Sequence, residues 1–311
     1  MKVIFMGTPD FSVRILEAVL DAGHEVVLAV SQPDKAVGRS KALKYTPVKE
    51  YAASRGIEVY QPARIRNVES YQYLFRYRPD IIIVVAFGQI IPKEILDLPK
   101  FGCVNVHASL LPKYRGAAPI QWAVINGDKT TGVTTMRMDE GVDTGDMILK
   151  EVVAIEPDET GGSLFEKLSA AGAALCVKTL QAIEAGTAVY TPQDEKCATH
   201  TAKIQKETGN IDWNKSASSI ECLIRGLDPW PSAYTRIQDK TLKIWKANVV
   251  SYDKKAAPGC VVEADKKHIY VQTGHGILEL LEVQLEGKKR MPAEVFLNGY
   301  HVEAGMMLHR C

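Results

Sequence analysis

Short runs of consecutive apolar residues alternate with amphipathic segments through the first half of the chain. The run at 80–86 (DIIIVVA) is the strongest, and its uninterrupted Ile and Val predict a strand buried on both faces, as in a parallel sheet. Between the runs, apolar residues recur at helical spacing, as at Phe11, Ile15 and Val19. The predicted strands cover residues 2–6, 25–30, 57–60, 80–86 and 103–107. Strands that alternate with helices predict a doubly wound, mostly parallel α/β sheet.

The second half of the chain has a different pattern. Leucines at helical spacing predict a long helix over 163–184, which Gly186 can end. Residues 190–209 are polar and have no apolar periodicity, so we interpret them as a linker. Beyond them, short apolar runs between turn residues predict a small β-barrel. The expected division is an N-terminal domain at 1–189, a linker at 190–209 and a C-terminal domain at 210–311.

Composition narrows the class of protein. The chain has 311 residues, 46% of them hydrophobic, which is ordinary for a globular protein of two domains. The net charge of +1 argues against a protein that coats nucleic acid by charge alone. The six cysteines form no C-x-x-C pair, which favours a reducing compartment. No stretch approaches the length of about 18 apolar residues that a membrane span needs. We therefore expect a cytoplasmic protein.

The most informative segment for chemistry is 103–119 (CVNVHASLLPKYRGAAP). Asn105 and His107 lie two residues apart at the end of a predicted strand, and alternation places both side chains on one face. An amide N–H can donate to a developing oxyanion, and an imidazole can donate to the same oxygen or move a proton. This pair suits acyl transfer. The alternative is a polar pair in the core that the main chain satisfies.

A second segment, 139–146 (DEGVDTGD), has four acids and two glycines in eight residues, which predicts a tight acidic turn. A carboxylate there could orient His107 and stabilise its cationic form. The alternatives are a surface turn with solvated acids and a cation site. An EF-hand is disfavoured because no bidentate Glu follows at the twelfth loop position.

Two loops follow predicted strands at the edge where ligands of such sheets bind. Residues 7–10 (GTPD) are not G-x-G-x-x-G, so the dinucleotide fingerprint is absent, although the turn could still receive a polar group. At 86–90 (AFGQI), Gly88 allows close approach of a ligand, and Phe87 could enclose a flat heterocycle. A plain strand-to-helix turn remains the alternative in both places.

The loop at 35–49 is rich in basic residues and contains no acid. Such a loop beside the ligand edge suits phosphate contacts to a nucleic acid, while a solvated surface loop is the alternative. A weaker candidate of the same kind is the cluster at 288–290 (KKR). The basic residues of the loop are Lys35, Arg39, Lys41, Lys44 and Lys49.

Two motifs, SLLPKYRGAAPIQ at 109–121 and MDEGVDTGDMI at 138–148, closely resemble those of the folate-dependent N-formyltransferases, above all their tRNA-directed members. The resemblance covers nearly the whole chain, because further motifs follow in the right order. These are FMGTPDFS at 5–12, SQPDKAVGR at 31–39, NIDW at 210–213, DPWP at 228–231 and KIWKA at 243–247. It implies a Rossmann-like formyltransferase domain followed by a small OB-like β-barrel.

The resemblance also implies site residues. The catalytic Asn, His and Asp of the family fall on Asn105, His107 and Asp143, and not on the other three acids of the turn. The one-carbon donor, 10-formyltetrahydrofolate, acts as co-substrate, and no metal takes part. Where the family often has Tyr, this chain has Phe87, which removes a hydroxyl. The expected folate contacts are Ser109, Leu110, Leu111 and Pro112, with Phe87, Gly88, Gln89 and Ile90 on the pterin side.

For the acceptor, the resemblance implies initiator methionyl-tRNA, held by Arg39 with Lys41 and Lys44 and by the C-terminal barrel. A monomer is expected. One alternative is formyl transfer to a small amine, such as glycinamide ribonucleotide or an amino-sugar nucleotide, which the basic loop and the added domain disfavour. Another is a noncatalytic RNA-binding protein, which the retained Asn, His and Asp disfavour. The missing fingerprint disfavours a dinucleotide-dependent oxidoreductase.

Overall fold

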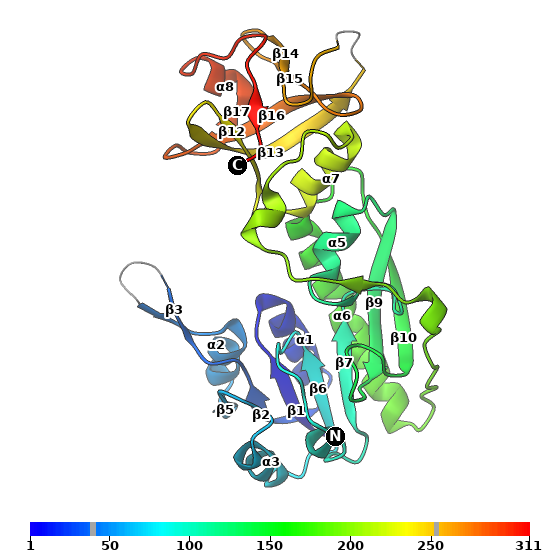
Figure 1. Ribbon diagram of the computed structural model, residues 1–311. Coiled ribbons are helices and arrows are strands. Elements are labelled where there is room, and N and C mark those ends of the chain that lie inside the picture. Colours follow the sequence, from blue (N-terminus) through cyan, green and yellow to red (C-terminus); the bar gives the residue numbers. More distant parts are fainter. Residues whose placement is uncertain (38–41, 252–254) are drawn as a thin grey trace. The chain divides into compact units, whose positions relative to one another are not determined.

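The computed structural model describes residues 1–37, 42–251 and 255–311, and these residues form two compact units (Figure 1). The units interleave along the chain, unlike the contiguous division expected from the sequence, which stays a prediction. Residues 190–201 of the expected linker belong to the first unit. Unit 1 comprises Met1–Pro119, Thr130–Ala154 and Phe165–Thr201, and unit 2 comprises Ile120–Lys129, Ile155–Leu164 and Ala202–Cys311.

Unit 1 is built on a seven-stranded sheet of order β10-β9-β7-β6-β1-β2-β5. Its parallel part consists of β1 (Lys2–Gly7), β2 (Glu25–Val30), β5 (Val59–Tyr60), β6 (Ile81–Val85) and β7 (Cys103–His107). These are the strands predicted from the apolar runs. Two antiparallel strands that the sequence pattern did not predict, β9 (Thr130–Arg137) and β10 (Met147–Ala154), extend the sheet beside β7.

Helices cover both faces of this sheet. On one face, α3 (Val68–Phe75) and α4 (Lys93–Leu96) pack on alternate residues of β1 and β6, such as Ile4 and Ile82. On the other, α1 (Asp10–Asp21) and α6 (Gly161–Glu184) lie against each other, with the rings of Phe11 and Phe165 in edge contact at 5.4 Å. The helix α2 (Pro47–Ser54) begins at Pro47, whose fixed φ suits the first helical position, and Thr46 caps it. The doubly wound fold is thus confirmed.

Short elements lie around the ligand edge of unit 1. A two-stranded hairpin, β3 (Lys35–Val37) and β4 (Ala42–Lys44), occupies the basic loop. A second small pairing joins β8 (Arg115–Gly116) to β11 (His200–Thr201) in parallel. The 3-10 helix η1 (Glu195–Cys197) precedes β11.

Unit 2 contains a curled antiparallel half-barrel in the region where the sequence predicted a small β-barrel. Its core surrounds Trp213, whose indole Nε1 donates to Thr235 Oγ1 at 3.0 Å. In spatial order the strands are β14 (Val261–Ala264), β15 (Ile269–Gln272), β16 (Ile277–Leu285), β13 (Lys240–Val250), β12 (Ala233–Ile237) and β18 (Leu308–His309), with β17 (Met291–Pro292) paired to β16. The remaining elements are α5 (Pro119–Ile125), η2 (Lys206–Gly209), α7 (Ala217–Gly226) and α8 (Ala293–Leu297).

Two features are absent from the described residues. None of the helices in these ranges is long and apolar enough to cross a membrane. Over the same ranges, no three His, Cys, Asp or Glu side chains are grouped so as to hold a metal ion.

Candidate active site

The site begins at the end of β7, where Asn105 and His107 are both buried in the sheet. Their register partners on β9 are Met136 and Thr134. The two side chains are 8% and 6% exposed. Alternation along the strand turns both toward the same carboxyl group, that of Asp143, which agrees with the expectation that they address one site.

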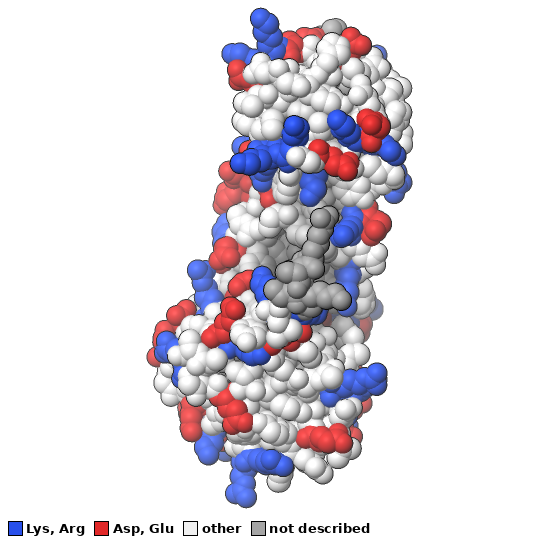
Figure 2. Space-filling model, turned by 90° about the vertical axis from the view of Figure 1, so that its left-hand side faces the viewer, with Lys and Arg blue, Asp and Glu red and all other residues white. Residues whose placement is uncertain are grey.

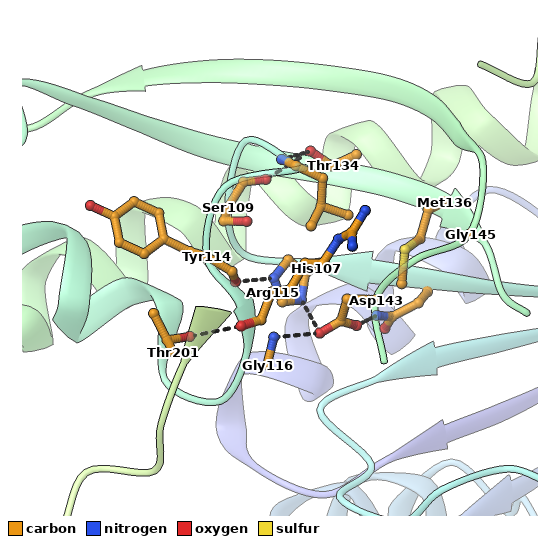
Figure 3. Close-up of polar contacts among 12 residues, drawn as sticks. His107, Ser109, Tyr114, Arg115, Gly116, Thr134, Met136, Asp143, Gly145 and Thr201 are labelled. Carbon is orange, nitrogen blue, oxygen red and sulfur yellow. Dashed lines mark hydrogen bonds and ion pairs between the residues drawn. The ribbon is translucent and has the colours of Figure 1, made fainter. Parts of the chain in front are cut away.

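Asp143 lies in the turn between β9 and β10 and completes the constellation (Figure 3). Its Oδ1 accepts a hydrogen bond from Asn105 Nδ2 at 3.3 Å. Its Oδ2 lies 3.7 Å from His107 Nδ1 and accepts a bond from the Gly116 main-chain N–H at 2.8 Å. The separation from the imidazole exceeds a hydrogen bond, so the contact is electrostatic. The structure therefore brings together the three side chains that the family resemblance singled out.

The other acids of the turn have different contacts. Asp139 closes the turn on itself, because its Oδ1 accepts from Gly141 N at 3.0 Å and from Thr144 Oγ1 at 2.6 Å. Glu140 lies 3.4 Å from Lys93 Nζ. These contacts explain why four acids in eight residues need not form one cation site.

The second nitrogen of His107 also has a partner. Its Nε2 lies 2.9 Å from the carbonyl oxygen of Tyr114. A carbonyl oxygen only accepts, so Nε2 carries the proton in this arrangement. The opposite nitrogen, Nδ1, faces the carboxylate of Asp143 at 3.7 Å, beyond hydrogen-bond distance. Both ring nitrogens therefore face acceptor oxygens.

The predicted folate segment, 109–112, is fixed by side chains that the sequence analysis missed. Thr134 Oγ1 donates to the Ser109 carbonyl at 2.7 Å and accepts from Leu111 N at 3.1 Å. Lys150 Nζ donates to the Leu111 carbonyl at 2.6 Å, and burial lowers the pKa of Lys150. Ser109 and Leu111 are buried, while Leu110 and Pro112 are partly exposed. Both supporting residues come from β9 and β10, which the apolar pattern did not show.

The predicted pterin-side loop is held mainly through its main chain. Thr8 Oγ1 and Gln32 Nε2 donate to the Phe87 carbonyl at 3.2 and 3.0 Å. The Phe87 ring is 2% exposed and packs in the apolar core, so it is not displayed at the surface. Ile90, in contrast, is 77% exposed. Whether the ring contacts a heterocycle stays a prediction.

A hollow of about 320 Å³ opens beside this loop. Gly88, with a φ of +83°, turns the chain there in a conformation that favours glycine. Gln89 is fixed by a bond from Ile65 N to its Oε1 at 2.7 Å. The lining residues are Gln32, Ala63, Arg64, Arg66, Gly88, Gln89 and Ile90.

The basic loop is only partly described. Arg39 and Lys41 lie outside the described residues. Lys44 is exposed and lies opposite Lys35 across the hairpin, so two positive charges face each other. Lys49 forms an ion pair with Asp34, just before the acid-free stretch, which neutralises one of its charges.

The weaker basic cluster lies in unit 2. Arg290 is paired with Asp228 at 3.2 Å and with Glu282, and its guanidinium lies over the Trp245 ring. Figure 2 shows acidic and basic side chains interspersed over most of the face it draws, in agreement with the net charge of +1.

Known proteins resemble this chain along its whole length. Residues 1–180 match the family described as formyl transferase, and residues 203–301 match the formyl transferase C-terminal domain. Relatives named methionyl-tRNA formyltransferase include one from Agathobacter rectalis, 65% identical over 98% of each chain. Another, from Lachnospira eligens, is 52% identical over 99% of each chain.

Solved structures agree on the fold. An N-formyltransferase from Helicobacter canadensis, in complex with folinic acid and dTDP-3-aminofucose, superposes with a TM-score of 0.67 at 19% identity. The match covers 94% of this chain and 100% of that chain. Sequence, domain order and fold agree, and the chain belongs to the formyl transferase family, in its group of methionyl-tRNA formyltransferases.

Proposed function

We propose that this chain transfers the formyl group of 10-formyltetrahydrofolate to the α-amino group of methionine on initiator tRNA. The observation that carries the proposal is the meeting of the buried Asn105 and His107 with the partly exposed Asp143 in one cluster beside the 109–112 segment. The identity of 65% to a named methionyl-tRNA formyltransferase supports the choice of acceptor.

In this proposal Asn105 stabilises the tetrahedral oxyanion that forms when the amine attacks the formyl carbon. One N–H of its amide donates to Asp143, and an amide has two N–H donors, which leaves one for the oxyanion. An α-amino group has a reference pKa of about 7.7–8.0, so a useful fraction is neutral near pH 7 and attacks without a strong base.

The role of His107 needs one exchange of partners. Both ring nitrogens face acceptors, so donation to the oxyanion requires Nε2 to exchange the Tyr114 carbonyl for the new oxygen. Asp143 then stabilises the imidazolium by its charge. When the bond from the formyl carbon to the folate N10 breaks, the imidazolium gives its Nε2 proton to N10, and the neutral ring then takes up the proton that the newly acylated amine releases.

We place the pterin end of the folate donor in the hollow beside the 86–90 loop, as the family resemblance implies for this loop. The backbone at Gly88 leaves room for close approach of a flat ring. We place the donor between this hollow and the 109–112 segment.

For the acceptor, we place phosphates of the tRNA against the basic hairpin, with Lys44 and the adjoining Arg39 and Lys41. The C-terminal half-barrel is proposed as a further tRNA contact. We also propose that the enzyme needs no metal and works as a cytoplasmic monomer.

The test is a single-turnover assay of formyl transfer from 10-formyltetrahydrofolate. Charged initiator tRNA is compared with glycinamide ribonucleotide and with an amino-sugar nucleotide as acceptors. The proposal expects product on the tRNA and little on the small amines. Preference for either small amine would reject the proposed acceptor but keep the formyl transfer, and no transfer to any of them would reject both.

A further inference from the structure

Residues 191–201, which we call the strap, are bonded to both segments that supply the candidate site. At one end, Thr191 and Met147 exchange two main-chain hydrogen bonds of 2.8 and 2.9 Å. At the other, the Arg115 N–H donates to the Thr199 carbonyl at 2.8 Å, and β11 pairs with β8. Figure 3 shows Thr201 of the strap bonded to Arg115 beside His107 and Asp143. The segment interpreted as a linker is therefore part of the site's surroundings.

One side chain of the strap reaches the acidic turn directly. Gln193 Nε2 donates to the main-chain carbonyls of Asp143 and Gly145, both at 2.8 Å. Its Oε1 accepts from Arg115 Nε at 3.0 Å. Because a guanidinium only donates, Oε1 must face Arg115, and the two N–H groups must then face the turn. The orientation of the amide is thus fixed by its neighbours.

Arg115 is itself held in place. Its side chain is 1% exposed, and its two terminal nitrogens bind Glu195 of the strap at 2.9 and 2.7 Å. This two-pronged pairing sets the plane of the guanidinium and with it the direction of the N–H that meets Gln193.

The main chain at Asp143 has an uncommon conformation. Its φ of +55° lies in the left-handed region, which residues other than glycine rarely adopt. The turn is also crowded, since a Cβ on Gly145 would lie 1.8 Å from the Arg137 carbonyl oxygen. The carboxyl group accepts one bond of ordinary length, from the Gly116 N–H at 2.8 Å, while its contacts to Asn105 and His107, at 3.3 and 3.7 Å, are longer and constrain the turn less.

We propose that Gln193 is a positioning residue for formyl transfer, which holds the Asp143 carboxylate at the imidazole by fixing the main chain of the turn. This role rests on the proposed function of the site. Gln193 does not touch the reacting atoms and acts through the turn that carries Asp143. Its loss therefore lowers the rate of the chemical step and leaves the binding of both substrates nearly unchanged.

The test substitutes Gln193→Glu, which keeps the length and the acceptor for Arg115 but turns an oxygen toward two carbonyl oxygens. Gln193→Met removes the donor without adding a charge. Misplacing a reacting group by about 1 Å can cost roughly 100-fold. We expect both variants to slow single-turnover transfer by roughly 10- to 100-fold, with KM for tRNA and folate within about twofold. Gln181→Glu, the same change at an exposed position of α6, is the matched control and should match the parent.

A double-mutant cycle with Asp143→Asn separates positioning from a general effect on structure. If Gln193 acts through Asp143, Gln193→Glu should slow the Asp143→Asn enzyme by less than about twofold. Equal losses in both backgrounds, or parental rates in both Gln193 variants, would overturn the inference. The unmodified enzyme, assayed in parallel, reports on the proposed function separately. Should it prefer a small amine, the same cycle is measured with that acceptor.

Discussion

Two threonines on β9 allow a matched test of how the 109–112 segment is supported. Thr134 and Thr131 are both buried, at 0% and 3% exposed. The Thr134 hydroxyl bonds to the main chain of Ser109 and Leu111. The Thr131 hydroxyl has no hydrogen-bond partner within the described ranges. Replacing either residue by Val removes the hydroxyl with little change in shape, so the pair isolates the two hydrogen bonds.

The expected changes in the free energy of unfolding follow from the buried polar groups that each substitution leaves without a partner. Thr134→Val leaves the buried Leu111 N–H without its acceptor, and an unsatisfied buried group costs about 1–3 kcal/mol. The bond to the Ser109 carbonyl is lost as well, so we expect the free energy of unfolding to fall by about 2–3 kcal/mol. Thr131→Val removes a hydroxyl whose burial is uncompensated, so the free energy of unfolding should be unchanged or rise by about 1 kcal/mol.

Urea unfolding, followed by circular dichroism and extrapolated to water, measures both values. Single-turnover transfer should also be slower in Thr134→Val, because the segment proposed to bind folate loses its support, and should stay at the parental rate in Thr131→Val. Similar destabilisation by the two substitutions would refute the reasoning, since it would show that the polar contacts of Thr134 contribute nothing beyond its shape.

Three further outcomes are expected. Asn105→Ala should slow single-turnover transfer about 10²- to 10³-fold, as expected for the loss of one oxyanion donor. Asn67→Ala, at the exposed start of α3, is the control and should keep the parental rate. Equal rates in the two variants would reject the role of Asn105 as an oxyanion donor. Lys44→Ala should lower the slope of log affinity for tRNA against log salt by about 1, and an unchanged slope would remove this residue from the phosphate contacts. Burial raises the pKa of Asp34, but hydrogen bonding and the charge of Lys49 outweigh it and hold that pKa below 3.8. Above pH 3.8, urea unfolding should therefore give Asp34→Asn a lower free energy of unfolding than the parent, and this difference should vanish as the pH falls through the lowered pKa. A difference in the free energy of unfolding that does not depend on pH would contradict this.

The parallel strands could be predicted because a strand that is buried on both faces has an unbroken run of apolar residues such as Ile and Val. The strand β9 could not, since its buried positions include Thr131, Thr134 and Thr135, whose hydroxyls are invisible to an apolar pattern. The edge strand β10 is half exposed and carries charged side chains such as Lys150, so it lacks a continuous apolar run as well.

The candidate site, like the fold, could be predicted only in part from the sequence. Strand alternation alone put Asn105 and His107 together, because a period of two is a local property. Choosing Asp143 among four acids required the family resemblance, since the backbone of a turn is not encoded in its composition. Gln193 was missed entirely. Its partners lie 48 to 78 residues away, and contacts at such separations leave no periodic signal.

The pairing of the strap also bears on how the protein folds. The bond from Tyr114 N to Thr199 Oγ1 closes a loop of 85 residues, so its formation costs far more chain entropy than a helical turn does. Local helices and the β9–β10 hairpin can form before that closure. Until the closure forms, the sheet would stand without the contacts that the strap makes to the turn of Asp143.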